Sequence, residues 1–560
     1  MRTYADRFWL RSYGPEVPGR LTYDDATISD LLARTVAVHR RRPALDFFGR
    51  TTSYGAFARQ VEVLAGGLAR LGVRAGDAVA IMLPSCPQHL VAFYAVLHLG
   101  ATVVEHNPLY TEAELDAPFR DHRAEVAIVW DKAVPVVERL AQHGAPVRHI
   151  VSVDLTTAMP ATKRAALRLP LPAARKARAA LTAPNRGTIS WADLASGRPA
   201  PRHTVSPDQA ALLLYTSGTT GEPKGVPLTH RNLVANVRMG RAWVPGIVEG
   251  EEVFLSSLPM FHAYGVTMCV LFGVHVGARL VLLPAPEIPL LIDAFKRITP
   301  TFVPAVPPIY ARILDETERR GVSIKGVRHS FSGAMSLPPD LVRRWEEATG
   351  GLLVEGYGLT EASPIVVGNP MTTRRRPGSI GVPFPDTEVR VVDPDDPDVE
   401  VPIGERGELI VRGPQVFHGY KDQPDETAQT FHRDWLRTGD IVRMDADGYL
   451  TIVDRIKEMV VTGGFNVYPT EVEHVLRSHP SIEDVAVVGA SHPDGGEEVA
   501  AIVVLADGHS LDEATLRAHA KESLTPYKVP RRWHKVDELP RNPMGKILRR
   551  QAARLLDHHG

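Results

Sequence analysis

The chain has 560 residues, of which 44% are hydrophobic and 23% are charged, and its formal net charge is −1. This length is too great for one ordinary domain, and a charge near zero gives no global case for binding nucleic acid or an anionic membrane. The two cysteines, Cys86 and Cys269, are too few for a disulfide framework or a zinc cluster and favour a reducing compartment.

Neither the first residues nor the most apolar segment of the chain predicts a membrane span. The first 20 residues lack the apolar core of a signal peptide. The most apolar long run, residues 266–283, is interrupted by His275 and Arg279, so it predicts a buried helix followed by a strand. We therefore expect a cytoplasmic protein.

The first part of the chain alternates amphipathic helices with short apolar strands. Residues 31–43 and 54–73 have helical spacing, whereas 77–84 and 101–107 are typical of buried strands. Similar alternation resumes over residues 277–334. Strand–helix alternation of this kind predicts an α/β fold with largely parallel sheets.

Residues 155–192 differ from the rest of the chain because they contain no acidic residue and seven basic ones. Two interpretations stay open: a peripheral contact with an anionic membrane surface, and, as the simpler one, a solvated basic insertion. The basic residues are Lys163, Arg164, Arg168, Arg175, Lys176, Arg178 and Arg186.

From about Gly378 the sequence changes to short strands separated by turns, which predicts a small β-rich subdomain. A compact α+β segment of about a hundred residues, a size typical of a separate domain, follows from Asp454. We predict an N-terminal domain over residues 1–453, built of two α/β subdomains and the β-rich subdomain, and a C-terminal domain over 454–560.

The stretch 215–230, "YTSGTTGEPKGVPLTH", combines hydroxyls, glycines and one lysine. Glycines let successive backbone N–H groups converge on phosphate oxygens, and hydroxyls and a cation add charge-assisted bonds. The stretch is not a Walker A loop, because Pro223 precedes Lys224 and disfavours a helix there. It predicts a hairpin-like phosphate-binding loop.

Four further motifs follow in order, and with the glycine-rich stretch they resemble the motif set of the adenylate-forming superfamily. This superfamily includes acyl-CoA synthetases, luciferases and the adenylation domains of peptide synthetases. The motifs are "GYGLTE" (356–361), "WLRTGD" (435–440), "DRIKEMVVTGGFNVYPTEVE" (454–473) and "LPRNPMGKILRR" (539–550). Stretches such as "FSGAMSLPPDL" and "GGFNVYPTEVE" look most like long-chain fatty-acid–CoA ligases.

The resemblance implies a reaction in two halves that uses ATP, Mg²⁺ and CoA. A fatty acid carboxylate and ATP give acyl-AMP and pyrophosphate, and the CoA thiol then displaces AMP. We expect a medium- or long-chain acid. The alternatives are a fatty acyl-AMP ligase that donates to a carrier protein, an aryl-CoA ligase or luciferase-like oxygenase, and a non-catalytic binding protein of the same fold.

For ATP, the resemblance implies that the loop 216–225 holds the β- and γ-phosphates, that Glu361 binds magnesium and that Asp440 accepts hydrogen bonds from the ribose hydroxyls. Tyr357 would offer an aromatic face to adenine. The predicted ATP-binding residues are Thr216, Ser217, Gly218, Thr219, Thr220, Gly221, Lys224, Ser332, Gly333, Ala334, Tyr357, Gly358, Asp440 and Arg455.

The predicted catalytic residues come from two of these motifs and from "PMFHAYG" (259–265): Lys546, Glu361, Thr360 and His262. By resemblance, Lys546 bridges the incoming carboxylate and the α-phosphate, Thr360 bonds the α-phosphate, and His262 borders the acyl pocket. Residues 302–308 and 354–355 would line that pocket, with Tyr264 considered as its gate.

The second half-reaction needs a different surface. In the superfamily the C-terminal domain is mobile and rotates about a hinge, which matches Lys457 here, and the glycine pair Gly463 and Gly464 would then contact the pantetheine arm of CoA. The expected partners are fatty acid, ATP and CoA, without nucleic acid. A homodimer and membrane association through 155–192 are further predictions.

Overall fold

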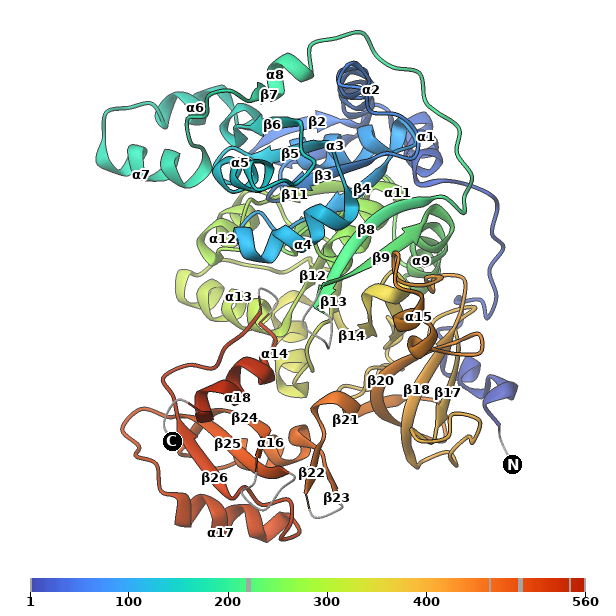
Figure 1. Cartoon of the computed structure of the whole chain (residues 1–560), viewed down its shortest axis with the longest axis vertical. Helices are drawn as coiled ribbons and strands as arrows, with labels where there is room; N and C mark the ends of the chain where they lie inside the picture. Colours follow the sequence, from blue (N-terminus) through green and yellow to red (C-terminus); the bar gives the residue numbers. More distant parts are fainter. Residues whose placement is uncertain (1–2, 218–222, 463–464, 492–496, 543–544, 558–560) are drawn as a thin grey trace.

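The computed structural model describes residues 3–217, 223–462, 465–491, 497–542 and 545–557. The larger, N-terminal part of the chain builds two large sheets and a third, smaller one, and the C-terminal part forms a separate lobe (Figure 1). The predicted α/β class is confirmed.

The first large sheet has seven strands in the order β7-β6-β5-β3-β4-β8-β9. All neighbours are parallel except β8 and β9, which form an antiparallel hairpin. Its strands are β3 (Ala78–Met82), β4 (Thr102–Glu105), β5 (Val126–Trp130), β6 (His149–Val153), β7 (Ile189–Ser190), β8 (Ala210–Ser217) and β9 (Pro223–Thr229).

The second large sheet has nine strands in the order β16-β15-β14-β13-β12-β10-β11-β1-β2 and is parallel through its middle. Its strands are β1 (Pro43–Phe47), β2 (Arg50–Ser53), β10 (Val253–Ser256), β11 (Arg279–Leu282), β12 (Phe302–Ala305), β13 (His329–Ser332), β14 (Leu352–Gly358), β15 (Ile365–Gly368) and β16 (Val382–Pro383).

Helices cover both sheets and carry the crossovers between parallel strands. They are α1 (Ile28–His39), α2 (Tyr54–Arg70), α3 (Pro87–His98), α4 (Glu112–His122), α5 (Val134–Gln142), α6 (Ala161–Ala166), α7 (Pro172–Leu181), α8 (Trp191–Leu194), α9 (His230–Trp243), α10 (Ala263–Gly265), α11 (Gly273–His275), α12 (Ile288–Arg297), α13 (Pro307–Arg320) and α14 (Pro339–Thr349). A buried π-helical segment, Val266–Phe272, joins α10 to α11.

The apolar run at 266–283 is a buried helical segment followed by β11, so the prediction for it is confirmed. None of the helices in the described ranges has the length and apolar character needed to cross a membrane.

A single apolar core joins the facing surfaces of the two large sheets and includes Phe57, Tyr94 and Phe272. A second core lies under α12, α13 and α14, where Tyr310 and Trp345 pack edge to face with ring centroids 4.6 Å apart. Because parallel strands are covered on both faces, their carboxyl ends present loops at one edge of each sheet, where ligands of open α/β sheets bind.

The predicted β-rich subdomain is a five-stranded sheet beside the two large ones. It contains β17 (Glu388–Val392), β18 (Arg406–Arg412), β19 (Phe431–His432), β20 (Trp435–Met444) and β21 (Leu450–Arg455), with helix α15 (Pro424–Thr430) between β18 and β19. Strand β21 continues to Arg455, which pairs with Asp440 of β20.

The C-terminal lobe contains a hairpin and a three-stranded sheet with apolar clusters on its two faces. Its elements are β22 (Val460–Thr462), β23 (Phe465–Val467), α16 (Pro469–Arg477), β24 (Ile482–Ser491), β25 (Glu497–Leu505), α17 (Glu513–Ser523), β26 (Arg532–Lys535) and α18 (Arg549–Asp557). Asp454 links it to β21, because its carboxylate accepts a hydrogen bond of 2.8 Å from the backbone N–H of Thr470.

Candidate active site

The glycine-rich stretch lies at the end of the hairpin of β8 and β9, as predicted. The strands stay in register to their tips, where Thr216 pairs with Lys224 and Ser217 with Pro223. Of the predicted phosphate ligands, Gly218, Thr219, Thr220 and Gly221 lie outside the described residues. Strand β9 leads directly into α9, whose N-cap Thr229 accepts a hydrogen bond from the backbone N–H of Asn232.

Lys224 is buried, with 7% of its surface exposed. Its ammonium group forms an ion pair with the carboxylate of Glu426 on α15 and lies 5.2 Å from the centre of the Tyr420 ring. A buried cation needs a nearby anion and acceptor, because burial without one is costly. Glu426 and the Tyr420 ring therefore hold the lysine at the base of the hairpin.

Tyr420 also contacts the motif that follows β14. Its hydroxyl donates a hydrogen bond of 2.8 Å to Oε1 of Glu361, and the backbone N–H of Phe417 donates one of 2.8 Å to the Glu361 carbonyl. Glu361 and Thr360 open a short 3₁₀ helix, Thr360–Ala362. The aromatic ring at position 420 thus connects the lysine of one motif to the carboxylate of another.

Glu361 suits Mg²⁺ because a carboxylate is a hard oxygen ligand. Tyr420 bonds only Oε1, so the other carboxylate oxygen can bind a further partner. Within the described ranges no group of three His, Cys, Asp or Glu side chains could hold a metal ion. A cation bound at Glu361 would complete its shell with phosphate oxygens and water, which is the usual arrangement for Mg²⁺.

The predicted ATP-binding residues Ser332, Gly333 and Ala334, here called the wall, lie at the end of β13. Ser332 ends the strand, and its buried Oγ has no hydrogen-bond partner among the described residues. Gly333 packs on Tyr264, where an added Cβ would lie 3.2 Å from the ring, and Ala334 has a left-handed backbone with φ of 67°. The wall therefore packs closely on Tyr264, and among the described residues the Ser332 Oγ is left without a hydrogen-bond partner.

The predicted ribose ligand Asp440 is buried on β20 and has two partners. The Tyr357 hydroxyl donates a hydrogen bond to its Oδ2, and Nε of Arg455 lies 2.9 Å from its Oδ1. Burial, with the neighbouring Asp440 charge, raises the pKa of Tyr357 well above its ordinary value, so the hydroxyl stays a donor. The predicted residues Tyr357, Asp440 and Arg455 are thus brought together. Gly358, by contrast, packs against the backbone of Pro364, where an added Cβ would lie 1.9 Å from the carbonyl oxygen.

Lys546 reaches this group from the C-terminal lobe. The loop that carries it is closed by Asn542, whose side-chain oxygen accepts a hydrogen bond of 2.9 Å from the Lys546 backbone N–H. Gly545, with φ of 82°, lies against Met335 of the loop after β13, where an added Cβ would lie 3.3 Å from the sulfur. The close approach of Gly545 to Met335 therefore brings the neighbouring Lys546, near the end of the chain, to the large domain.

Burial and the surrounding charges together lower the pKa of Lys546. Burial is the main cause that lowers the pKa of its ammonium group, and the Arg455 guanidinium lowers it further, whereas Glu458 and Asp440 oppose the shift. Nζ of Lys546 lies 3.9 Å from Oε1 of Glu458.

Four residues of the site were missed by sequence reasoning: Tyr420, Glu426, Glu458 and Arg549. Arg549 pairs with Glu458 and, at 2.9 Å, with Glu473 of α16, so it holds the carboxylate that faces Lys546. Glu458 belongs to the quoted motif 454–473. Tyr420 and Glu426 could have been found if "GYKDQPDETAQTF" (419–431) had been treated as a further motif.

The predicted acyl region is near the wall. The ring nitrogen Nδ1 of His262 accepts a hydrogen bond of 3.3 Å from the Tyr264 backbone N–H, and burial lowers the pKa of His262 to about 4. The Tyr264 hydroxyl donates to the Phe331 carbonyl, which fixes the ring under Gly333. His262 is therefore a neutral imidazole at neutral pH.

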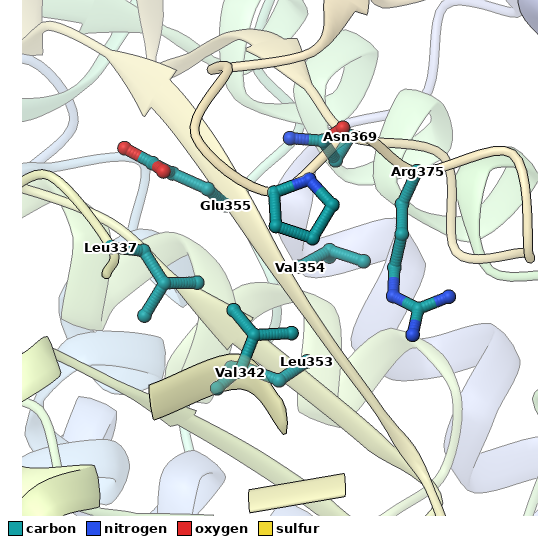
Figure 2. A pocket seen from close by; sticks show the side chains of 8 residues that line it. Leu337, Val342, Leu353, Val354, Glu355, Asn369 and Arg375 are labelled. Carbon is teal, nitrogen blue, oxygen red and sulfur yellow. The ribbon is translucent and has the colours of Figure 1, made fainter. Parts of the chain in front are cut away.

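A small cavity lies beside Val354 and Glu355 on β14 (Figure 2). Its volume is about 10 Å³, which is room for about one water molecule and none for an acyl chain. Burial raises the pKa of the Glu355 carboxyl to about 8. The other lining residues are Leu337, Val342, Leu353, Asn369, Arg375 and Pro377.

The predicted residues of the second half-reaction are not placed by the structure. Gly463 and Gly464 lie outside the described residues, as does the side chain of Lys457, whose backbone belongs to the 3₁₀ helix Ile456–Glu458. The described site therefore consists of the hairpin lysine, the Glu361 carboxylate, the Asp440 group and Lys546.

Comparison with known proteins identifies both parts of the chain. A model described as AMP-binding enzyme matches residues 32–421, and one described as AMP-binding enzyme C-terminal domain matches residues 471–546. Two curated relatives, each named long-chain-fatty-acid–CoA ligase, cover 97% of this chain and 97% of their own length: one from Bacillus subtilis (strain 168) at 36% identity, and one from Escherichia coli O157:H7 at 35%. A feruloyl-CoA synthase from an Amycolatopsis species is 34% identical over 90% of this chain and 94% of its own.

Solved structures share the fold over nearly the whole chain. The anthranilate CoA ligase AuaEII, in complex with anthranoyl-AMP, has a TM-score of 0.81 and 28% identity over 96% of this chain and 99% of its own. ATP-bound MatB from Rhodopseudomonas palustris has a TM-score of 0.80 and 28% identity over 94% and 98%.

Proposed function

The chain belongs to the AMP-binding enzyme family, and from that premise we propose that it is an ATP-dependent fatty acyl-CoA synthetase. The relatives named long-chain-fatty-acid–CoA ligase, similar over nearly the whole chain, support this substrate class. The reaction would join a medium- or long-chain fatty acid to CoA, with ATP cleaved to AMP and pyrophosphate.

The observation that carries the proposal is the position of Lys546. The preceding Gly545 lies against Met335 of the large domain, Nζ of Lys546 lies 3.9 Å from Oε1 of Glu458, and the charges of Asp440 and Arg455 are close enough to shift its pKa. In the first half-reaction an oxygen of the fatty acid carboxylate forms a bond to the α-phosphorus of ATP, and the bond from that phosphorus to pyrophosphate breaks. An ammonium group at this point neutralises charge on both reactants as they approach.

The other residues would bind and orient ATP. Asp440 would accept hydrogen bonds from the ribose hydroxyls, Lys224 and the hairpin would bind the β- and γ-phosphates, and the free Oγ of Ser332 would bond the adenine or its sugar. When bound at Glu361, Mg²⁺ would neutralise developing charge on the phosphates. Thr360 would bond the α-phosphate.

For the second half-reaction we propose that the C-terminal lobe, beyond the end of β21 at Arg455, rotates as a unit about Lys457, which withdraws Lys546. Gly463 and Gly464 would then lie beside the pantetheine arm. The CoA sulfur forms a bond to the acyl carbon, the acyl–phosphate oxygen bond breaks, AMP leaves, and the thiol proton goes to solvent.

Selectivity for longer chains would come from apolar burial, at about 0.8 kcal/mol for each methylene group. His262, being neutral, would border the carboxylate without holding it as an ion pair. A homodimer remains a prediction, and light scattering of the purified protein would test it.

The proposal is tested by mass spectrometry of the products formed from ATP, Mg²⁺, CoA and a mixture of fatty acids of graded length with ferulic and anthranilic acids. We expect acyl-CoA from the longer fatty acids. Acyl-AMP without acyl-CoA would support a donor to a carrier protein instead, and products from the aromatic acids alone would support an aryl-CoA ligase, to which the feruloyl-CoA synthase similarity points.

A further inference from the structure

The basic stretch 155–192, here called the arm, stands out from the body of the molecule. It contains α6 and α7, neither of which has a buried residue, and the connection between these two helices forms the extreme edge of the fold at the upper left of Figure 1. A helical pair that buries no side chain gains little from the core of its own protein.

The arm is nevertheless attached to the body at both ends. At its start, the Lys163 ammonium group lies 5.3 Å from the centre of the Phe48 ring. At its end, Nε1 of Trp130 donates a hydrogen bond of 2.9 Å to the Leu181 carbonyl, and Nδ2 of Asn185 donates one of 2.9 Å to the Asp131 carbonyl. The arm is therefore held in one place with its far turn pointing outward, which a merely solvated insertion does not require.

The charges of the arm have no counterions in the described part of the chain. All seven of its Lys and Arg residues lack an ion pair with a described residue, and no acidic residue lies between Leu155 and Ala192. Several surface arginines elsewhere are paired: Arg343, for example, lies 2.6 Å from Asp340 and 3.1 Å from Glu347. The arm thus concentrates unpaired positive charge on a protein whose net charge is −1.

The outer turn between the helices is apolar. Leu169 and Leu171, on either side of Pro170, are 50% and 55% exposed and are among the most exposed large apolar residues of the described chain. Arg168 precedes them and Arg175 and Lys176 follow in α7. Unpaired cations around exposed leucines match a surface with phosphate groups outside and acyl chains beneath, which is the boundary of an anionic bilayer.

We propose that the arm docks the protein on anionic lipid bilayers, with Leu169 and Leu171 entering the headgroup boundary and the basic side chains contacting lipid phosphates. Nucleic acid fits less well, because the turn offers leucines and no aromatic ring on which bases could stack. The proposal concerns binding alone and stands apart from the reaction, so its test does not depend on activity.

The test is co-sedimentation of the full chain with phosphatidylcholine vesicles that contain or lack phosphatidylglycerol. We expect binding only to the anionic vesicles, weakened by salt. The triple variant Arg168→Glu, Lys176→Glu and Arg178→Glu should bind at least about a hundredfold more weakly, since each basic residue near the surface contributes about a fivefold factor. The double variant Leu169→Ser and Leu171→Ser should lose the part of the binding that persists in high salt.

The matched control changes three exposed basic residues elsewhere, Arg312→Glu, Lys325→Glu and Lys521→Glu, and so makes the same change in net charge. It should keep most of the vesicle binding. Equal losses in the arm and control variants would mean that only net charge matters and would overturn the proposal, as would wild-type protein that binds neither vesicle or that binds a DNA duplex in preference. An unchanged melting temperature shows that each variant is folded.

Discussion

The Tyr357 hydroxyl donates a hydrogen bond to the carboxylate of Asp440, although the two residues are 83 positions apart in the chain. Tyr357 is on β14 of the nine-stranded sheet and Asp440 on β20 of the β-rich sheet. The bond therefore fixes the predicted adenine face and the predicted ribose ligand relative to each other before ATP binds.

Replacing Tyr357 with Phe keeps the ring and removes this donor. Because hydrogen bonds to charged groups are worth about 1.5 to 3 kcal/mol, we expect the KM for ATP to rise by about tenfold or more with a smaller effect on the KM for the fatty acid. Steady-state pyrophosphate release measures both. The control is Tyr23→Phe, which removes a 3.0 Å hydrogen bond to Asp386 away from the site and should leave both constants unchanged. Equal effects of the two variants would contradict the assignment.

Replacing Lys546 with Ala should lower acyl-AMP formation by orders of magnitude while sparing thioester formation from supplied acyl-AMP. The reason is that its ammonium group is close enough to Asp440 and Arg455 for their charges to shift its pKa, and it would serve only the first half-reaction. Pyrophosphate release and acyl-CoA formation report the two steps separately. Lys521→Ala, on α17 of the same lobe, is the control. A parallel loss of both steps would refute the separation.

The first half-reaction should fail at high pH through Lys546. Burial and Arg455 lower the pKa of this lysine in the folded protein below the ordinary 10.5, so its charged form is lost as pH rises through that lowered value. Pyrophosphate release should therefore decline at a lower pH than an exposed lysine allows. In Lys546→Arg the guanidinium stays charged, and the decline should move to higher pH. An alkaline decline at the same pH in both proteins would exclude Lys546 as its source.

Glu426→Gln removes the carboxylate that pairs with buried Lys224. We expect a loss of stability of about 1 to 3 kcal/mol, because the buried ammonium group of Lys224 loses its partner, and a larger rise in melting temperature on adding ATP than in the wild type. The triphosphate would then supply the missing charge. Glu388→Gln, which breaks the pair with Arg412 on the surface of the β-rich sheet, should change the ATP response little. An ATP response no larger than that of the wild type would argue against phosphate binding at Lys224.

Glu355→Gln tests the buried carboxyl. Its pKa is raised from 4.5 to about 8 by burial, so the folded protein holds a proton that the unfolded chain releases. This contribution to stability is complete below pH 4.5 and is lost as pH rises toward 8, with a slope of up to about 1.4 kcal/mol per pH unit. The Gln variant should lose this slope and be the more stable protein at alkaline pH. Parallel melting curves of both proteins across this range would contradict it.

The sequence alone was sufficient for the class of fold and for most of the chemistry. Alternating helices and strands reflect burial on both faces of a parallel sheet, and that periodicity is local. The glycines and charges around Lys224, Glu361, Asp440 and Lys546 lie in contiguous motifs whose order along the chain is specific. For the same reason the hairpin of β8 and β9 could be predicted from Pro223 and its neighbours.

Only the tertiary structure decided which of these residues meet and what supports them. Lys224 and Glu426 are 202 positions apart, and no periodicity or motif in either segment states that they pair. The roles of Tyr420 and Glu458, the raised pKa of Glu355 and the lack of counterions for the arm among the described residues all depend on which groups are brought close and on how much water is excluded. Burial and Coulomb interactions act through space, so they are set by the packing of distant segments and leave no mark on local sequence.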